Sequence, residues 1–80
     1  MGSILKMQAN WDDEAQVWVV HRTPIPGLVA EASTIPQLIA KLKILIPEML
    51  EENGGFSTSQ SEIPFEVVAG VTTFASNTAQ

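Results

Sequence analysis

One stretch with helical hydrophobic spacing constrains the fold of this chain most. The segments on both sides of it have the residue patterns of strands. Between Ile35 and Leu50 the apolar residues recur every three or four positions, which places them on one helical face. Ser33 stands where a helix N-cap is expected, and Asn53 to Gly55 can supply a left-handed C-cap. The apolar face consists of Ile35, Leu38, Ile39, Leu42, Leu45, Ile46, Met49 and Leu50.

Pro47 is the one residue that does not suit this helix. Proline has no amide donor, and its ring clashes with the carbonyl four residues earlier, here that of Lys43. The sequence therefore predicts either a bend at residues 43–47 or two helical pieces.

The segments around the helix have strand character. Ile4 to Trp11 alternates between apolar and polar residues, whereas Val17 to His21 is apolar on both faces and is expected at the centre of a sheet. So few residues separate these two segments that they must form an antiparallel hairpin. The expected strands are residues 4–11, 17–21, 28–32 and 63–74. Pro64 indicates that the last of them either lies at a sheet edge or has the proline at its own start.

Eighty residues and 8.7 kDa leave room for one hydrophobic core. The predicted order is β-β-β-α-β, which belongs to the α+β class. We expect one domain over residues 4–74, with a flexible tail at 75–80. Residues 1–3 are either a cloning remnant or an N-terminal extension.

Composition excludes several classes of function. The net charge of −5 and a pI near 4.5 argue against direct nucleic-acid binding, which normally needs a basic surface. The absence of Cys excludes disulfides and thiolate metal sites. The sequence has neither an apolar run long enough for a membrane span nor a signal-peptide pattern, so a soluble cytoplasmic protein is expected. Only 16% of the residues are charged, which favours self-association.

Three motifs, in this order, go beyond a generic α+β domain. They are an acidic turn before an aromatic strand (WDDEAQVWVV), a proline–glycine corner (TPIPGLVAEAST) and a helix end (LIPEMLEENG). Together they resemble the HicB-like antitoxin superfamily and, more closely, a small bacterial family of uncharacterised function related to it. The resemblance covers about residues 4–70. It implies a partial RNase H-like βββαβ fold, in which a three-stranded antiparallel meander carries a final strand parallel to the first and one amphipathic helix covers one face.

The resemblance also implies a function. Proteins of this family bind HicA, a small basic ribonuclease toxin, and neutralise it by occlusion. The implied role is thus a non-enzymatic protein-binding module with a HicA-like partner. Many family members carry a DNA-binding segment after this domain, but residues 75–80 contain no Lys or Arg, so no direct DNA contact is expected here.

Seven residues are the candidates for partner binding. Acidic side chains would steer a basic partner, and apolar side chains would anchor it. Trp18 is an anchor if it faces away from the helix, and otherwise it packs in the core. The candidates are Asp12, Asp13, Glu48, Glu51 and Glu52 for steering, with Trp18 and Ile44 as anchors.

Two other functions stay open. One is an orphan domain without a toxin, acting as a homo-oligomeric scaffold or regulatory module, as a dimer or a higher oligomer. The other is a metal-dependent nuclease, which would need carboxylates converging on metal ions. Neighbouring acids of one turn point in different directions, and His21 has no evident catalytic partner, so we expect no catalytic, metal or cofactor residue.

Overall fold

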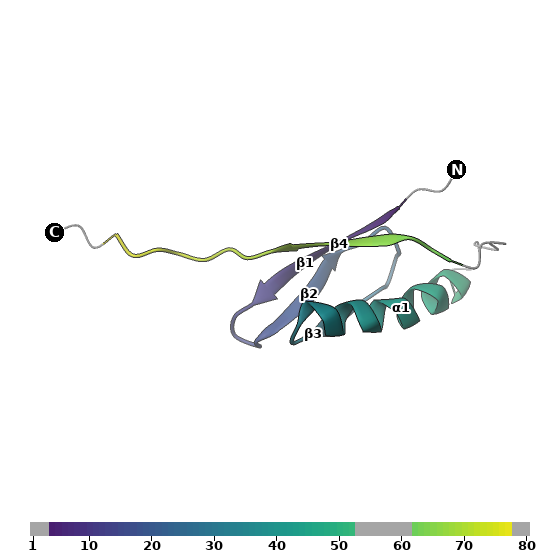
Figure 1. Ribbon diagram of the computed structural model, residues 1–80, viewed down its shortest axis with the longest axis horizontal. Coiled ribbons are helices and arrows are strands. Elements are labelled where there is room, and N and C mark those ends of the chain that lie inside the picture. The colour runs from purple at the N-terminus through teal and green to yellow at the C-terminus, as the bar shows by residue number, and fades with distance from the viewer. Residues whose placement is uncertain (1–3, 53–61, 78–80) are drawn as a thin grey trace.

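The computed structural model describes residues 4–52 and 62–77, and within them the chain is an α+β domain (Figure 1). One four-stranded sheet has the order β3-β2-β1-β4, in which β1, β2 and β3 form an antiparallel meander and β4 runs parallel to β1. The predicted fold class, element order and strand directions are therefore confirmed. The elements are β1 (Leu5–Asp12), β2 (Val17–Arg22), β3 (Glu31–Ala32), α1 (Ile35–Glu52) and β4 (Phe65–Gly70).

The third strand is shorter than predicted. Only Glu31 and Ala32 pair with β2, although the carbonyl of Ala30 still accepts a hydrogen bond from the amide of Val20 at 3.0 Å. The preceding corner is a set of tight turns, in which Gly27 adopts φ 80°. Because its two prolines lack amide donors, regular pairing begins only after this corner. The corner still contributes to the core, since Ile25 is buried.

The helix differs from its prediction at its start and at Pro47. The N-cap is Thr34 rather than Ser33, since the Thr34 hydroxyl oxygen accepts the amide of Gln37 at 3.2 Å and the helix begins at Ile35. The helix also continues through Pro47, so the two-piece alternative is wrong. Pro47 lies on the exposed side, where water can reach the carbonyl of Lys43 that lacks a donor. The predicted C-cap at residues 53–55 lies outside the described residues.

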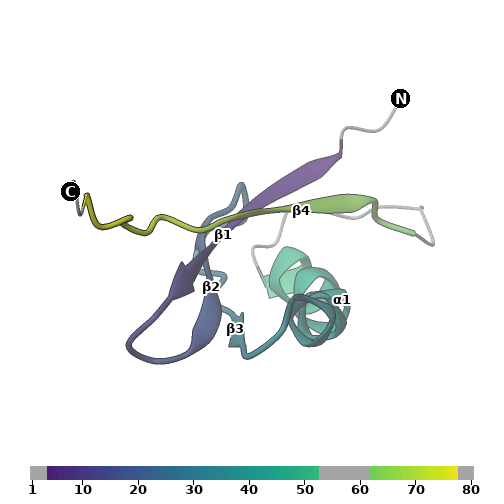
Figure 2. The same ribbon diagram turned by 60° about the vertical axis from the view of Figure 1, so that its left-hand side comes forward.

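The core lies between α1 and one face of the sheet (Figure 2). The helix contributes Leu38, Leu42, Ile46 and Leu50, all buried, as the 3–4 spacing predicts. From β1, Met7 and Ala9 are fully buried, which confirms the alternation predicted for this strand. The remaining buried residues are Val20, Ile25, Leu28, Ala30 and Ala32.

The last strand is half as long as predicted and less covered than β1. It ends at Gly70, where its pairing with Asn10 of β1 ends. Phe65 and Val67 pack against the core only in part, and residues 71–77 continue beyond the sheet (Figure 1). Since β1 ends two residues after Asn10, it offers no pairing partner beyond residue 72.

Candidate protein-binding surfaces

The two aspartates of the hairpin are engaged within their own turn. Oδ1 of Asp12 accepts the backbone amides of Glu14 at 3.1 Å and Ala15 at 3.3 Å. Oδ1 of Asp13 accepts the indole N–H of Trp11 at 3.2 Å and the side-chain amide of Gln16 at 3.3 Å. Side-chain bonds of this kind stabilise turns. Both carboxylates are exposed, but their contacts give them a structural role in the turn.

Trp18 lies on the helix side of the sheet and packs partly against the core. The alternative in which it faces away from the helix is therefore wrong. Trp18 sits opposite Trp11 in the hairpin register, with ring centroids 5.3 Å apart and planes tilted by 59°. This arrangement is typical of an aromatic packing pair. The short hairpin turn was the sequence signal that could have predicted this pairing.

A shallow apolar cleft of about 400 Å³ lies beside this tryptophan pair at the start of α1. Ile35 and Val71 complete its apolar wall, and neither residue was among the sequence candidates. Val71 reaches this cleft only because β4 lies beside β1 in the tertiary fold. The cleft is lined by Trp11, Trp18, Ser33, Thr34, Ile35 and Val71.

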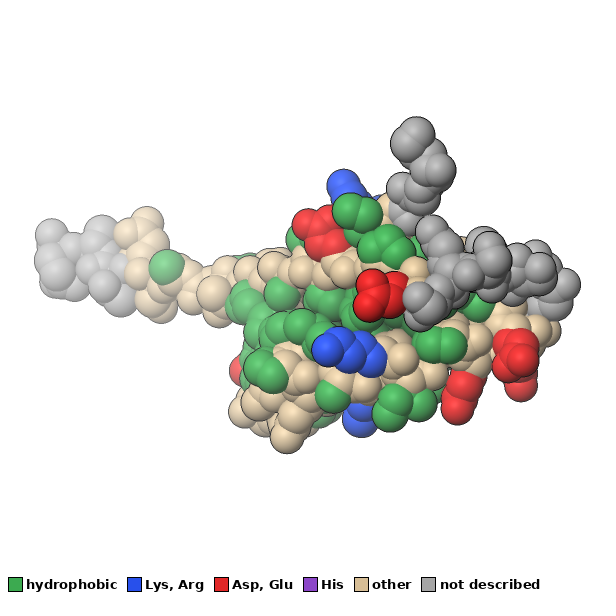
Figure 3. Space-filling view, turned by 45° about the vertical axis from the view of Figure 1, so that its right-hand side comes forward, with side chains coloured by type: hydrophobic (Ala, Val, Ile, Leu, Met, Phe, Trp, Pro, Cys, Tyr) green, Lys and Arg blue, Asp and Glu red, His purple; other side chains and the backbone are tan. Residues whose placement is uncertain are grey.

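The other four candidates lie together on the outer side of α1. Ile44 is 65% exposed and is followed at helical spacing by Glu48 and Glu51, with Glu52 adjacent. The last turn of α1 contains no basic residue, so these carboxylates add to the negative end of the helix dipole. Figure 3 shows acidic side chains gathered at this end of the molecule. The structure thus joins an exposed apolar residue to an acidic helix end.

The seven candidates do not form one patch. Trp18 lies near the start of α1, in the β1–β2 hairpin that also carries Asp12 and Asp13, whereas Glu51 and Glu52 lie at the end of α1. Figure 1 shows the hairpin and the end of α1 on opposite sides of the domain. An 18-residue helix is about 27 Å long. A partner that covers both groups would have to span the whole domain, so the outer side of α1 is a surface by itself.

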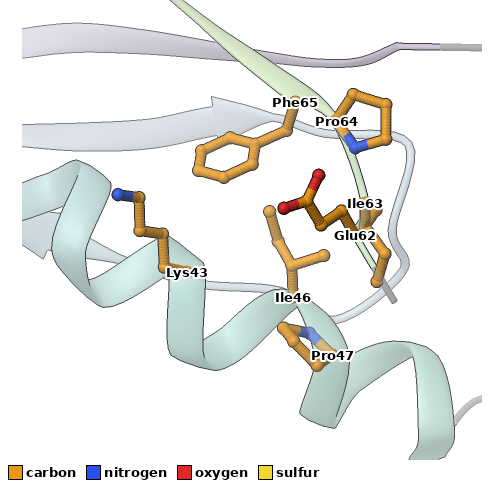
Figure 4. Close-up of a pocket in the computed structure, with 7 residues that line it drawn as sticks. All are labelled: Lys43, Ile46, Pro47, Glu62, Ile63, Pro64 and Phe65. Atoms are coloured by element: carbon orange, nitrogen blue, oxygen red, sulfur yellow. The ribbon is translucent and has the colours of Figure 1, made fainter. Parts of the chain in front are cut away.

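A larger cavity of about 620 Å³ opens between α1 and the start of β4 (Figure 4). Ile46 and Phe65 extend toward it from opposite walls, and the carboxylate of Glu62 points into it. Its lining joins one ammonium group, that of Lys43, and one carboxylate to apolar side chains. This combination is not specific for any one ligand.

The described part of the chain holds neither a cluster of metal ligands nor a helix that could span a membrane. In residues 4–52 and 62–77, no three His, Cys, Asp or Glu side chains gather closely enough to hold a metal ion. His21 is exposed at the end of β2. The one helix in this part of the chain, α1, lacks the apolar length that crossing a membrane requires.

Over residues 4–52 and 62–77, fold and surfaces together define a small α+β domain with one helix and a mixed four-stranded sheet. Residues 4–75 match the model of a protein family, DUF1902, described as a domain of unknown function. The chain belongs to this family. A search of curated proteins finds no match.

A similar fold is known from a crystal structure. It is that of the hypothetical protein TTHA1013 from the extremely thermophilic bacterium Thermus thermophilus, with a TM-score of 0.65 and 43% sequence identity. The similarity covers 92% of this chain and 99% of the other. The match to a family of unknown function agrees with the closer of the two resemblances noted in the sequence, whereas the relation to HicB stays a prediction.

Proposed function

We propose that this chain is a non-enzymatic protein-binding domain of the HicB-like antitoxin type, which neutralises a small basic ribonuclease by covering it in the cytoplasm. It needs no cofactor and makes no direct contact with nucleic acid. The observation that carries the proposal is the outer side of α1, where exposed Ile44 is followed by Glu48, Glu51 and Glu52. The sequence resemblance to HicB gives the partner its chemical class.

The electrostatics of this surface favour a basic partner. Carboxylates at a helix C-terminus repel the partial negative charge of its free carbonyl groups, and no basic side chain of the last turn compensates them. A positively charged protein surface would relieve that repulsion. Since such charges act at long range, they would speed the encounter, while burial of Ile44 would slow dissociation.

Capture of the partner tests the proposal. The tagged chain is used as bait in nuclease-treated lysate of its source, and the bound proteins are identified by mass spectrometry. We expect stoichiometric recovery of a small basic protein that cleaves RNA and stops cleaving when this chain is added. A recovered partner whose RNA cleavage continues in the presence of this chain would refute the antitoxin role.

A charge-reversal pair then locates the surface. The double variant Glu48→Lys/Glu51→Lys and its control Glu14→Lys/Glu66→Lys each change the net charge by four, two for each substitution, from −5 to −1. We expect the helix pair to slow association about tenfold at low salt, and the control pair to have a much smaller effect. Equal slowing by both pairs would show that net charge, not this surface, governs binding.

Self-association is the second candidate function. In this case the chain is an orphan homo-oligomeric scaffold or regulatory domain without a toxin. The exposed segment after β4, with its apolar Val71 and Phe74, favours this alternative.

A further inference from the structure

The seven residues that follow β4 project from the domain. This segment, residues 71–77, is called the arm below; it leaves the sheet and runs past the β1–β2 hairpin (Figures 1 and 2). The molecule accordingly measures 62 Å along its longest axis but 25 and 20 Å along the others. Val71 is 57% exposed and Phe74 92% exposed. Ordering an extended chain costs conformational entropy. We therefore expect a binding partner to stabilise a projecting apolar arm.

The strand that leads into the arm has a free edge. Among the described strands β4 is the last of the sheet, with β1 on one side only. The Pro64 carbonyl accepts the amide of Leu5, so the backbone groups of alternate residues point to β1 and those of Phe65, Val67 and Ala69 point outward. An open edge of this kind is a template for another strand. The opposite edge is formed by β3, which has only two residues.

We propose that the occupant of this edge is a second copy of the chain. In the proposed dimer, β4 and the arm of one copy pair antiparallel with β4 and the arm of the other, about a two-fold axis at Val71. Each arm then lies along the free edge of its partner's β4. Seven extended residues span about 23 Å and the six residues of β4 about 20 Å, so the lengths match. The two sheets become one, with eight strands.

The apolar residues select this register. Six large hydrophobic side chains are exposed in the described residues, and three of them, Val68, Val71 and Phe74, lie on β4 and the arm at intervals of three. A register centred on Val71 places Val71 opposite its own copy and Val68 opposite Phe74 of the second copy. Residues opposite each other share one face of an antiparallel pair, so each apolar side chain meets another.

Charge also favours a second copy over a foreign peptide. Residues 67–77 contain no charged side chain, so pairing this segment with itself brings no like charges together. Glu66, the nearest acid, faces Ser76 of the second copy in the proposed register. The same segment supplies the open edge and the strand that fills it, so the surface is complementary to itself, as a two-fold interface requires.

The solution mass of the full chain tests the dimer. We expect 17.4 kDa by light scattering, twice the chain mass of 8.7 kDa, and a monomer for Val71→Asp, which places two carboxylates together at the two-fold axis. Val29→Asp makes the same change at an exposed residue of the corner before β3, outside both proposed surfaces, and should remain dimeric. Circular dichroism verifies that both variants are folded. A monomeric parent chain, or a dimer that survives Val71→Asp, would overturn the proposal.

Disulfide trapping tests the register. The chain has no Cys, so Val71→Cys introduces a single thiol. Directly opposed residues of an antiparallel pair have Cα atoms about 4.5–5.5 Å apart, within the range that a disulfide bridges. We expect Val71→Cys to cross-link to itself on mild oxidation. Val68→Cys is the matched control, since its own copy would lie about 20 Å away, and comparable cross-linking of both variants would refute the register.

This inference deepens the second candidate function and does not depend on the first. The interface uses β4 and the arm, whereas the antitoxin proposal uses the outer side of α1. Loss of the dimer in Val71→Asp with toxin binding intact would separate the two. Conversely, a dimer with no toxin in the capture experiment would leave only the self-association candidate.

Discussion

Met7 and Val67 occupy the same row of the sheet but have different surroundings. They are neighbours in the parallel pairing of β1 with β4, and their side chains point to the helix side. Met7 is fully buried, whereas Val67 is only partly buried. Both stand in segments of alternating sequence, so the alternation by itself cannot explain the difference. The two strands differ in their neighbours: β1 has β2 on one side and β4 on the other, whereas β4 is the last of the described strands and has β1 on one side only.

The largest effect expected follows from this pair. Met7→Ala removes a fully buried side chain and should lower the free energy of unfolding by about 2–5 kcal/mol. Val67→Ala should cost about 1 kcal/mol, because part of that side chain already contacts water. Urea unfolding followed by tryptophan fluorescence measures both. Equal losses would mean that Val67 is shielded from water as completely as Met7, and would remove the contrast between β4 and β1.

A smaller effect tests how the start of α1 is fixed. Thr34→Ala removes the hydroxyl that caps the helix and should cost about 1 kcal/mol of unfolding free energy. Ser33 only donates a hydrogen bond to the side chain of Gln37, so Ser33→Ala is the matched control. It should lower the free energy of unfolding by only a few tenths of a kcal/mol. Thermal unfolding of the two variants distinguishes them. A larger loss in Ser33→Ala would show that Ser33, the N-cap predicted from the sequence, is the residue that caps the helix.

The smallest effect concerns the turn between β1 and β2, on the side of the sheet away from β4. Gln16 has φ 60°, a left-handed conformation that costs about 1–2 kcal/mol for a residue with a side chain. Gln16→Gly and Gln16→Ala lose the same side-chain hydrogen bonds to Asp13. The Gly variant should be more stable than the Ala variant by about 0.5 kcal/mol, since the strain relieved exceeds the added chain entropy. Equal stabilities in urea would show that the turn relaxes without glycine.

Local chemistry made most elements predictable. The alternation of β1 placed Met7 and Ala9 in the core, and the 3–4 spacing of α1 selected its buried face. Strand order and directions followed from the short hairpin connection and from the family resemblance. The outer side of α1 was predictable for the same reason, because the exposure of Ile44 and Glu48 follows from helical period alone.

Errors occurred where the outcome depends on contacts between distant segments. Ser33 and Thr34 are both good N-cap residues, and only the path from β3 into the helix selects Thr34. Residues 71–74 continue the apolar pattern of β4, yet they form no strand, and β1 reaches only two residues past its last pair, that of Asn10 with Gly70. Trp18 carries no signal of which sheet face it occupies, since its strand is apolar on both sides.

The sequence alone therefore determined which segments are strands or helix and which residues of each segment are apolar, because periodicity is a property of neighbouring residues. The tertiary structure decided where α1 rests on the sheet, which face Trp18 shares with the core, and where the pairing of β4 ends. These depend on packing between elements far apart in the chain, which hydrophobic periodicity does not encode.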